Sequence, residues 1–320
     1  MRDRNPISRP SAEESSLTDA IQAIESRGGC VFQSKDAPSP YAAALHDLIG
    51  DAYVVDLSGA DIIDEDLIQL KKIPSISELN LRNTHITDHS LVLIGSFHKL
   101  RSLNLSGTLI TDNEFSKLST LSELRQLNVE GTKINDRSLA VIANYSKLEE
   151  LVLGKTCITD SGLLAIECLK NLRKLEVSGT KISNKSLSSF RNMPRLESLD
   201  LSGTNISDEG LQTIASIEGL THITLSNTNI GNQNLAQLGR LRKLEYLWLN
   251  DTKVGDDGIS KLSKIPTLSQ LSLINTSVTD AGLMYLTANH NLKKVYLEGT
   301  NVTDGGKKRL RATLPHVSYY

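Results

Sequence analysis

The sequence predicts an α/β solenoid, with a curved sheet of parallel strands on the concave face and short helices on the convex face. A block of 24 residues recurs eleven times between Ala52 and Pro315 without an insertion or deletion. A fixed period of this length is typical of solenoids, in which each unit buries its apolar side chains only against its neighbours. Within each block the hydrophobic spacing changes from two residues to three, which indicates one strand and one helical segment per unit.

The strand comes first in each block. Leu103 and Leu105 are two residues apart, and the same spacing recurs at Leu127 and Val129. Side chains two residues apart lie on the same face of a strand. Each return segment crosses over before the next strand begins, so successive strands must lie side by side and parallel.

The return segment is predicted to be helical, over about two to three turns. Leu163 and Ile166 are three residues apart, as are Leu187 and Phe190. Because this spacing places both members of a pair on one face of a helix, we expect that face to cover the sheet.

The N-terminal region is predicted to be a tail and a cap. Residues 1–14 are polar without periodicity, and we expect them to be disordered. Residues 15–51 are predicted to form the cap that a solenoid needs over its exposed apolar end. Within the cap we expect a helix from Ser16 to Arg27, an edge strand at Cys30–Phe32 and a second short helix from Tyr41 to Ile49.

The repeats occupy residues 52–315, and residues 316–320 are predicted to be a C-terminal closing segment. Lys307 stands where other units carry an apolar residue, so the pattern is ending there. Leu314–Val317 is predicted to supply a closing strand.

The repeated template is L-x-x-L-x-L-x-x-T-x-I-T-D-x-x-L-x-x-L-x-x-L-x-x, and it resembles the leucine-rich repeat over about 264 of 320 residues. Its T-x-I-T-D variant is similar to repeats of bacterial, planctomycete-type proteins, and also to the slightly longer repeats of F-box substrate receptors. The cap region shows no F-box pattern, which argues against a ubiquitin-ligase adaptor. The resemblance implies a leucine-rich-repeat solenoid, a fold that hosts many unrelated binding functions.

A threonine recurs where each predicted strand ends. A buried hydroxyl left without a hydrogen bond costs about 1–3 kcal/mol, so we expect each one to bond backbone groups of its own turn or the adjacent turn. A nucleophilic role is disfavoured because no base recurs beside these residues. The row comprises Thr84, Thr108, Thr132, Thr156, Thr180, Thr204, Thr228, Thr252, Thr276 and Thr300.

An aspartate recurs immediately before each helical segment. The simplest interpretation is a helix N-cap, each contributing about 1 kcal/mol, and a carboxylate there also complements the positive end of the helix. A row of cation ligands is the alternative, but capping also explains the neutral substitutions Asn184 and Asn232. The row comprises Asp64, Asp88, Asp112, Asp136, Asp160, Asp208, Asp256, Asp280 and Asp304.

Composition favours a binding protein. The 35 basic and 37 acidic residues nearly balance, so no net field favours nucleic acid or an anionic membrane. No apolar run is long enough to span a membrane. The N-terminal residues lack the apolar region of a secretory signal, so we expect a cytoplasmic protein, with an exported or envelope-associated one as the alternative. Three cysteines, Cys30, Cys157 and Cys168, form no disulfide framework and fit a reducing compartment.

Groupings that would support catalysis or metal binding are not found. His85 and His89 are four residues apart, but His85 precedes the predicted helix, and no third ligand is evident. We therefore expect neither a cofactor nor a metal, and a protein that is not an enzyme.

The outward strand positions do not serve the core, so they carry the information about binding. Trp248, the only tryptophan, alternates with the inward Leu247 and Leu249 and must face the concave side. Binding surfaces are enriched in Trp and Tyr. The alternative is that neighbouring rings merely stack on each other. The predicted partner-binding residues are Trp248, Tyr246, Tyr296, Ile274 and His222.

The sequence thus favours a non-catalytic, monomeric module that recognises a protein partner on its concave face. A preformed sheet loses little conformational entropy when a partner binds. A structural or adhesive protein of the cell envelope, or an adaptor resembling substrate receptors, is the alternative.

Overall fold

The computed structural model describes residues 12–33, 36 and 52–320. The chain divides after Leu124 into two compact units, so that unit 2 is Arg125–Tyr320 and unit 1 is everything before it. The expected disorder of residues 1–11 and the expected helix Tyr41–Ile49 lie outside the described residues.

Unit 1 begins with an antiparallel strand pair and continues with parallel strands. β1 pairs antiparallel with β2, which confirms the edge strand expected at Cys30–Phe32, and β2, β3 and β4 pair in parallel. Helix α1 begins four residues before the expected Ser16, so residues 12–14 are helical rather than part of a disordered tail. The elements, with η for 3₁₀ helix, are α1 (Ala12–Glu25), β1 (Cys30–Gln33), β2 (Tyr53–Asp56), η2 (Asp64–Lys72), β3 (Ile76–Asn80), η3 (Asp88–Ser90), α3 (Leu91–Ile94), β4 (Ser102–Asn104) and η4 (Phe115–Thr120).

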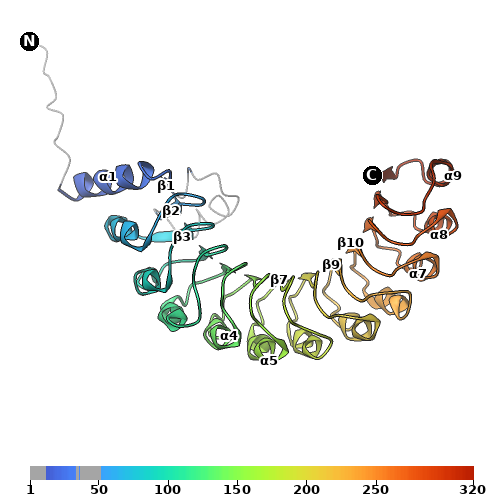
Figure 1. The fold of residues 1–320 in the computed structure, drawn as a ribbon, viewed down its shortest axis with the longest axis horizontal. Helices are drawn as coiled ribbons and strands as arrows, with labels where there is room; N and C mark the ends of the chain where they lie inside the picture. The colour runs from blue at the N-terminus through green and yellow to red at the C-terminus, as the bar shows by residue number, and fades with distance from the viewer. Residues whose placement is uncertain (1–11, 34–35, 37–51) are drawn as a thin grey trace, which may run out of the picture. The chain divides into compact units, whose positions relative to one another are not determined.

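Unit 2 is a parallel sheet in strict chain order from β5 to β13. Its strands line the inner side of the coil and its helical segments the outer side (Figure 1). The elements are β5 (Gln126–Asn128), α4 (Asp136–Ile142), β6 (Glu150–Val152), α5 (Asp160–Leu163), η5 (Leu164–Cys168), β7 (Lys174–Glu176), η6 (Ser186–Asn192), β8 (Ser198–Asp200), η7 (Asp208–Gly210), α6 (Leu211–Ile214), β9 (His222–Thr224), η8 (Leu235–Arg240), β10 (Tyr246–Trp248), α7 (Asp256–Leu262), β11 (Gln270–Ser272), α8 (Asp280–Tyr285), η9 (Leu286–Ala288), β12 (Lys294–Tyr296), α9 (Asp304–Thr313) and β13 (Ser318–Tyr319).

Two features of unit 2 correct the sequence prediction. The closing strand is Ser318–Tyr319 rather than Leu314–Val317, because the constant register pairs Lys294 with Ser318. The return segments are short mixtures of α and 3₁₀ helix, many of them briefer than two turns. A 3₁₀ helix rises about 2.0 Å per residue against about 1.5 Å for an α-helix, so a short unit spans the return path with fewer residues.

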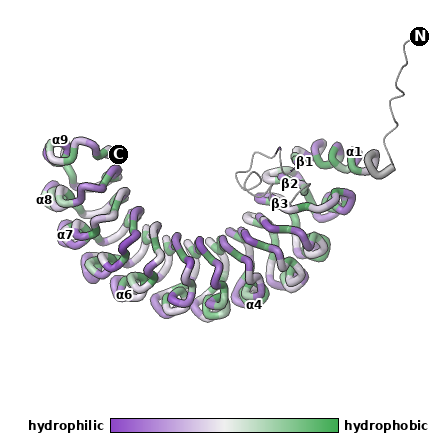
Figure 2. The backbone as a smooth tube through the Cα atoms, turned by 180° about the vertical axis from the view of Figure 1, so that it is seen from behind, coloured by the Kyte–Doolittle hydropathy of each residue, from purple (hydrophilic) through white to green (hydrophobic). Residues whose placement is uncertain are grey.

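The core lies between the strands and the helical segments. Hydrophobic and hydrophilic residues alternate along each turn of the coil (Figure 2). Leu175 on β7 and Leu163 and Ile166 on the return segment are fully buried, as the two spacings predict. The same positions are filled in unit 1, where Leu103 and Leu91 are buried. Within each compact unit, every repeat therefore adds one layer to the apolar core.

The threonine row serves the turns, as expected. Each hydroxyl donates to the carbonyl oxygen three residues earlier in its own turn, for example Thr228 Oγ1 to Leu225 at 2.6 Å and Thr84 Oγ1 to Leu81 at 2.8 Å. The hydroxyl satisfies its own bonding while buried, and it closes the turn that ends each strand.

The aspartate row does not cap its own helices, so that prediction is wrong. The N-cap is the preceding residue: the Thr279 hydroxyl accepts from the Ala281 N–H at the start of α8, and Thr159 does the same at α5. The aspartate side chain instead accepts hydrogen bonds from the next 24-residue repeat. Asp256 accepts from the Thr279 N–H at 2.8 Å and from its hydroxyl at 2.6 Å.

This contact, which we call the carboxylate clamp, joins successive units through one side chain. The bond to the residue 23 positions on is made by Asp64, Asp88, Asp136, Asp160, Asn184, Asp208, Asn232, Asp256 and Asp280. At Asn184 an amide takes the place of the carboxylate. Its Oδ1 accepts from the Ser207 N–H, and its Nδ2 donates to the Ser207 hydroxyl. Neutral substitutions are therefore compatible with the clamp as well as with capping.

In several repeats the clamp leaves no room for a side chain at the start of the next helix. A Cβ at Gly282 would lie 2.1 Å from Asp256 Oδ1, and one at Gly306 would lie 2.1 Å from Asp280 Oδ1. Glycine is present here because the carboxylate of the preceding unit occupies the space of a side chain.

We predict that Asp256→Ala lowers the free energy of unfolding by about 2 kcal/mol, because two charge-assisted hydrogen bonds are lost. Asp256→Asn should cost about half as much, since asparagine already fills this position in other units. Urea unfolding measures both. In a double-mutant cycle with Thr279→Val, a coupling energy near zero would show that the clamp contributes nothing.

A pH dependence follows from Asp280. The backbone and hydroxyl hydrogen bonds from Thr303, with Arg309 nearby, lower the pKa of this carboxyl below its ordinary 3.8. A carboxyl with a lowered folded-state pKa stabilises the folded protein above its unfolded-state pKa. This stabilisation is lost as the pH falls from the unfolded-state pKa through the folded-state pKa. We therefore expect Asp280→Asn to flatten the loss of stability between about pH 5 and about pH 3. Equal pH slopes for wild type and variant would contradict this assignment.

Candidate functional site

The site is built on three-residue strands whose middle side chain points into the core. On β10, Leu247 is fully buried, whereas Trp248 is 43% exposed and Tyr246 is partly exposed. The register aligns Trp248 with Thr224 on β9 and with Ser272 on β11. The indole therefore stands on the inner face of the sheet between two small side chains.

The surrounding aromatic rings form two stacked pairs. The rings of His222 and Tyr246 are 4.0 Å apart between centroids and tilted by 9°. Those of Tyr296 and Tyr320 are 5.1 Å apart and tilted by 21°. Stacking thus accounts for these four rings, but no ring contact of Trp248 occurs among the described residues.

The structure brings the five sequence-predicted residues onto one face of unit 2. Tyr246 and Trp248 are on β10, His222 is their neighbour on β9, and Tyr296 lies two strands from Trp248. Ile274 lies in the turn that follows β11, and its N–H donates to Asn250 Oδ1 at 3.0 Å. We call this set, together with Tyr320, the aromatic patch.

Tyr320 was missed by the sequence reasoning. It is 59% exposed and stacks on Tyr296. The signal was present, because residue 320 follows Tyr296 by one 24-residue period. Placing the closing strand at Leu314–Val317 hid it.

In other repeats, the residue at the position of Trp248 holds the turn that follows the strand. In five other 24-residue repeats the equivalent residue is Asp or Asn. Its side-chain oxygen accepts a hydrogen bond from the backbone N–H of the residue two positions later. These residues are Asp56, Asn80, Asn104, Asn128 and Asp200. Such a side chain stabilises the turn locally. Trp248 cannot accept a hydrogen bond in this way.

Neighbouring side chains provide the missing acceptors around Trp248. The Asn250 N–H donates to the Ser226 hydroxyl at 3.3 Å, and Asn250 Oδ1 accepts from the Ser272 hydroxyl and the Ile274 N–H. The turns near the aromatic patch are therefore held by these hydrogen bonds, and the side chain of Trp248 is not needed to hold its turn.

His222 is the histidine of the patch. Burial lowers the pKa of its imidazole, although the charges of Glu245 and Glu197 act in the opposite direction. The neutral ring is thus favoured, which suits stacking against Tyr246.

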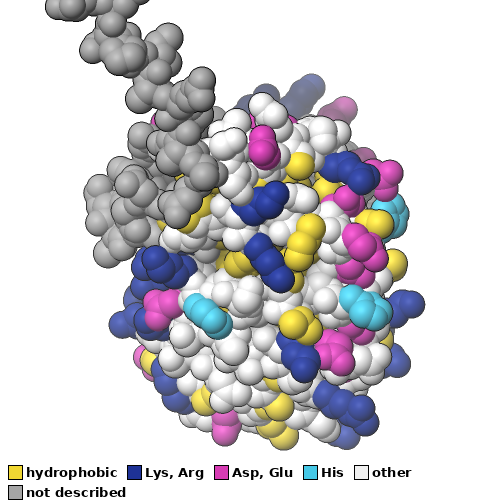
Figure 3. Space-filling view, turned by 90° about the vertical axis from the view of Figure 1, so that its left-hand side faces the viewer, with side chains coloured by type: hydrophobic (Ala, Val, Ile, Leu, Met, Phe, Trp, Pro, Cys, Tyr) yellow, Lys and Arg dark blue, Asp and Glu magenta, His cyan; other side chains and the backbone are white. Residues whose placement is uncertain are grey.

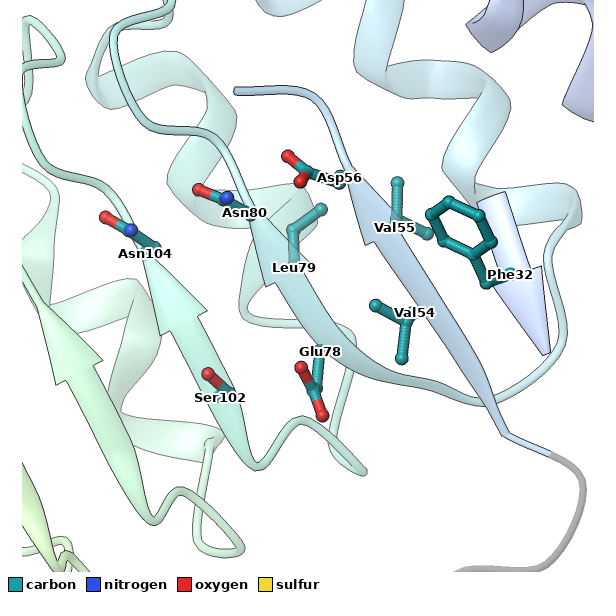
Figure 4. Close-up of a pocket in the computed structure, with 9 residues that line it drawn as sticks. All are labelled: Phe32, Val54, Val55, Asp56, Glu78, Leu79, Asn80, Ser102 and Asn104. Atoms are coloured by element: carbon teal, nitrogen blue, oxygen red, sulfur yellow. The ribbon is translucent and has the colours of Figure 1, made fainter. Parts of the chain in front are cut away.

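A hollow lies on the sheet face of unit 1, with a volume of about 320 Å³. Phe32 borders it, and Asp56, Asn80 and Asn104 form a row across its three parallel strands (Figure 4). The side-chain oxygens of this row accept from their own turns. These side chains are therefore already used in holding the turns.

Basic, acidic and hydrophobic side chains are interspersed over the face shown in Figure 3. His85 and His89 each approach one carboxylate, and nowhere in the described part of the chain do three potential ligands gather as a metal site would require. Within that part, no helix has the length and apolar character needed to cross a membrane.

Family models agree with the repeat geometry. A model described as Leucine rich repeat matches residues 146–206 and 171–230, and a second model of the same description matches residues 240–263. The chain is a leucine-rich repeat protein. No curated protein matches it. Leucine-rich repeats are typical of protein–protein interaction modules, which is the class of function that this fold supports.

Solved structures show the same fold at low identity. An internalin from Listeria monocytogenes is similar with a TM-score of 0.59 and 20% identity, covering 98% of each chain. A TDR receptor has a TM-score of 0.59 and 17% identity, and the plant peptide hormone receptor RGFR1, in complex with RGF2, has 0.53 and 14%. Each of these two matches covers 82% of this leucine-rich repeat chain and 46% of the receptor chain.

Proposed function

We propose that this leucine-rich repeat protein binds a polypeptide partner on the inner face of its sheet, and that the aromatic patch supplies most of the binding energy. Trp and Tyr dominate binding hot spots because they bury a large area at low conformational cost. The patch includes Trp248 and Tyr320, which are both exposed, beside rings already ordered by stacking. A partner would therefore meet a preformed surface.

The position of Trp248 carries the proposal. Five other repeats use the equivalent residue to hold the turn, whereas here the Ser226 hydroxyl accepts from the Asn250 N–H, and Asn250 Oδ1 accepts from the Ile274 N–H in the turn after β11. An exposed indole contributes little to folding, so its presence at a position with an alternative structural use supports a role in binding.

The proposal includes a non-catalytic role and a compartment that keeps thiols reduced, such as the cytoplasm. Cys30, Cys157 and Cys168 are all free and exposed. Exposed thiols persist in reducing compartments and are oxidised or paired elsewhere. An adhesive role at the cell envelope would require export, so locating the native protein separates the two functions.

We expect Trp248→Ala to weaken partner binding by about 2 kcal/mol or more while changing the free energy of unfolding by less than about 0.5 kcal/mol. The partner would first be isolated with the intact chain and identified by mass spectrometry. Affinity is then measured by calorimetry and stability by urea unfolding.

The matched control is Tyr285→Ala, which removes an aromatic ring that is 50% exposed on helix α8. This control should leave binding unchanged. If Trp248→Ala binds as wild type does, or if it unfolds the chain, the aromatic patch is not the binding surface. Asn104→Ala is unsuitable as a control, because the Asn104 side chain holds its own turn.

The thiols give an independent prediction. Because all three cysteines are exposed, a thiol reagent should titrate three groups per chain in the native protein purified without reductant. Finding one reactive thiol would indicate an internal disulfide and would favour the exported alternative.

A further inference from the structure

Charged residues of opposite sign lie on the strands to either side of Trp248. Glu176 on β7 and Asp200 on β8 lie on one side. Lys294 lies on the other side, on β12 beside Tyr296, and Lys293 immediately precedes that strand. Trp248 on β10 therefore lies between an acidic and a basic edge of the same sheet.

The acidic edge concentrates negative charge. Glu176 and Asp200 are directly aligned on adjacent strands, and like charges in that relation repel. Lys174 pairs with Glu176 at 2.7 Å. Burial raises the pKa of the Asp200 carboxyl, and the charge of Glu176 raises it further, whereas the hydrogen bonds from Ser202 and the charge of Lys174 lower it. A cation placed here would relieve the repulsion between the two carboxylates.

Asp200 keeps one oxygen available for such a cation. Its Oδ1 accepts from the N–H and the hydroxyl of Ser202, at 2.8 and 2.6 Å. No contact among the described residues uses its Oδ2. Asp200 can thus hold its turn and still bind an external group.

The basic edge is uncompensated. Lys294 is half-buried and Lys293 is exposed, and neither makes an ion pair within residues 52–320. An anionic group beside Tyr296 would therefore find an ammonium group that has no competing carboxylate.

Resting on the proposed function, we infer that the bound element is an extended polypeptide segment of about six residues that crosses the strands from β8 to β12. It carries a basic side chain at the β8 end, an apolar or aromatic one over Trp248, and an acidic one at the β12 end. Four strand spacings of about 4.8 Å give a span of about 19 Å. An extended chain covers this with about six residues, whereas six helical residues reach about 9 Å.

The test selects random twelve-residue peptides displayed on phage against the intact chain and measures a labelled peptide of the enriched sequence by fluorescence anisotropy. The enriched peptides should carry Lys or Arg about four to six residues from Asp or Glu, with an apolar residue between them. Asp200→Asn should weaken binding about fivefold, because asparagine keeps the turn bond, as it does at residues 104 and 128, but loses the charge. Asp56→Asn makes the same chemical change at the equivalent position of unit 1 and should have no effect.

Charge reversal tests the other end. Lys294→Glu should weaken the selected peptide about tenfold or more, and replacing the acidic residue of the peptide by Lys should restore binding. Lys264→Glu, the same charge reversal at an exposed lysine after helix α7, is the matched control. If Trp248→Ala abolishes binding but the charge variants change nothing, the inferred polarity is wrong and the proposed function stands. If the peptide binds Trp248→Ala as tightly as wild type, the proposed function is wrong. A selection that enriches no peptide overturns the extended segment.

Discussion

The carboxylate clamp is the contact on which the regular register depends. One side chain, such as Asp256, accepts both the N–H and the hydroxyl of the residue that caps the next helix. That same hydroxyl accepts from the helix it caps, so a single aspartate orients the start of the following return segment. The bonded pair is 23 residues apart in every clamp, which matches the absence of insertions over the eleven repeats.

A fixed register also determines which residues are free to vary. The inward strand residue fills the apolar core, the strand-end threonine closes the turn, and the clamp holds the helix. The outward strand residues take no part in these contacts between layers. Side chains on that face are therefore selected by local turn chemistry or by what the face binds, which is why the inner face of unit 2 is the informative surface.

The sequence predicted the parts of the fold that repeat. Spacings of two and three residues placed Leu175 and Ile166 in the core, and the threonine hydroxyls bond within their own turns as expected. It failed where the answer depended on a neighbouring unit. A carboxylate before a helix suits both an N-cap and a bond to the next turn, and the letters of one unit cannot separate them. Tyr320 was lost for a related reason, since its partner Tyr296 is one period away.

Strand alternation alone placed four of the predicted aromatic-patch residues, and Ile274 lies in the turn after β11. The reason to consider the patch functional came from the hydrogen bonds. An exposed indole alone is compatible with packing on a neighbouring ring. Trp248, however, has no ring contact among the described residues, and it stands where Asp200 and Asn128 hold their turns. The Ser226 hydroxyl accepts from the Asn250 N–H in its place, and Asn250 Oδ1 serves the turn that follows β11. A turn that is stabilised by other means leaves its strand-end side chain under no structural constraint, and a large apolar ring at an unconstrained, exposed position is most simply explained by contact with a partner.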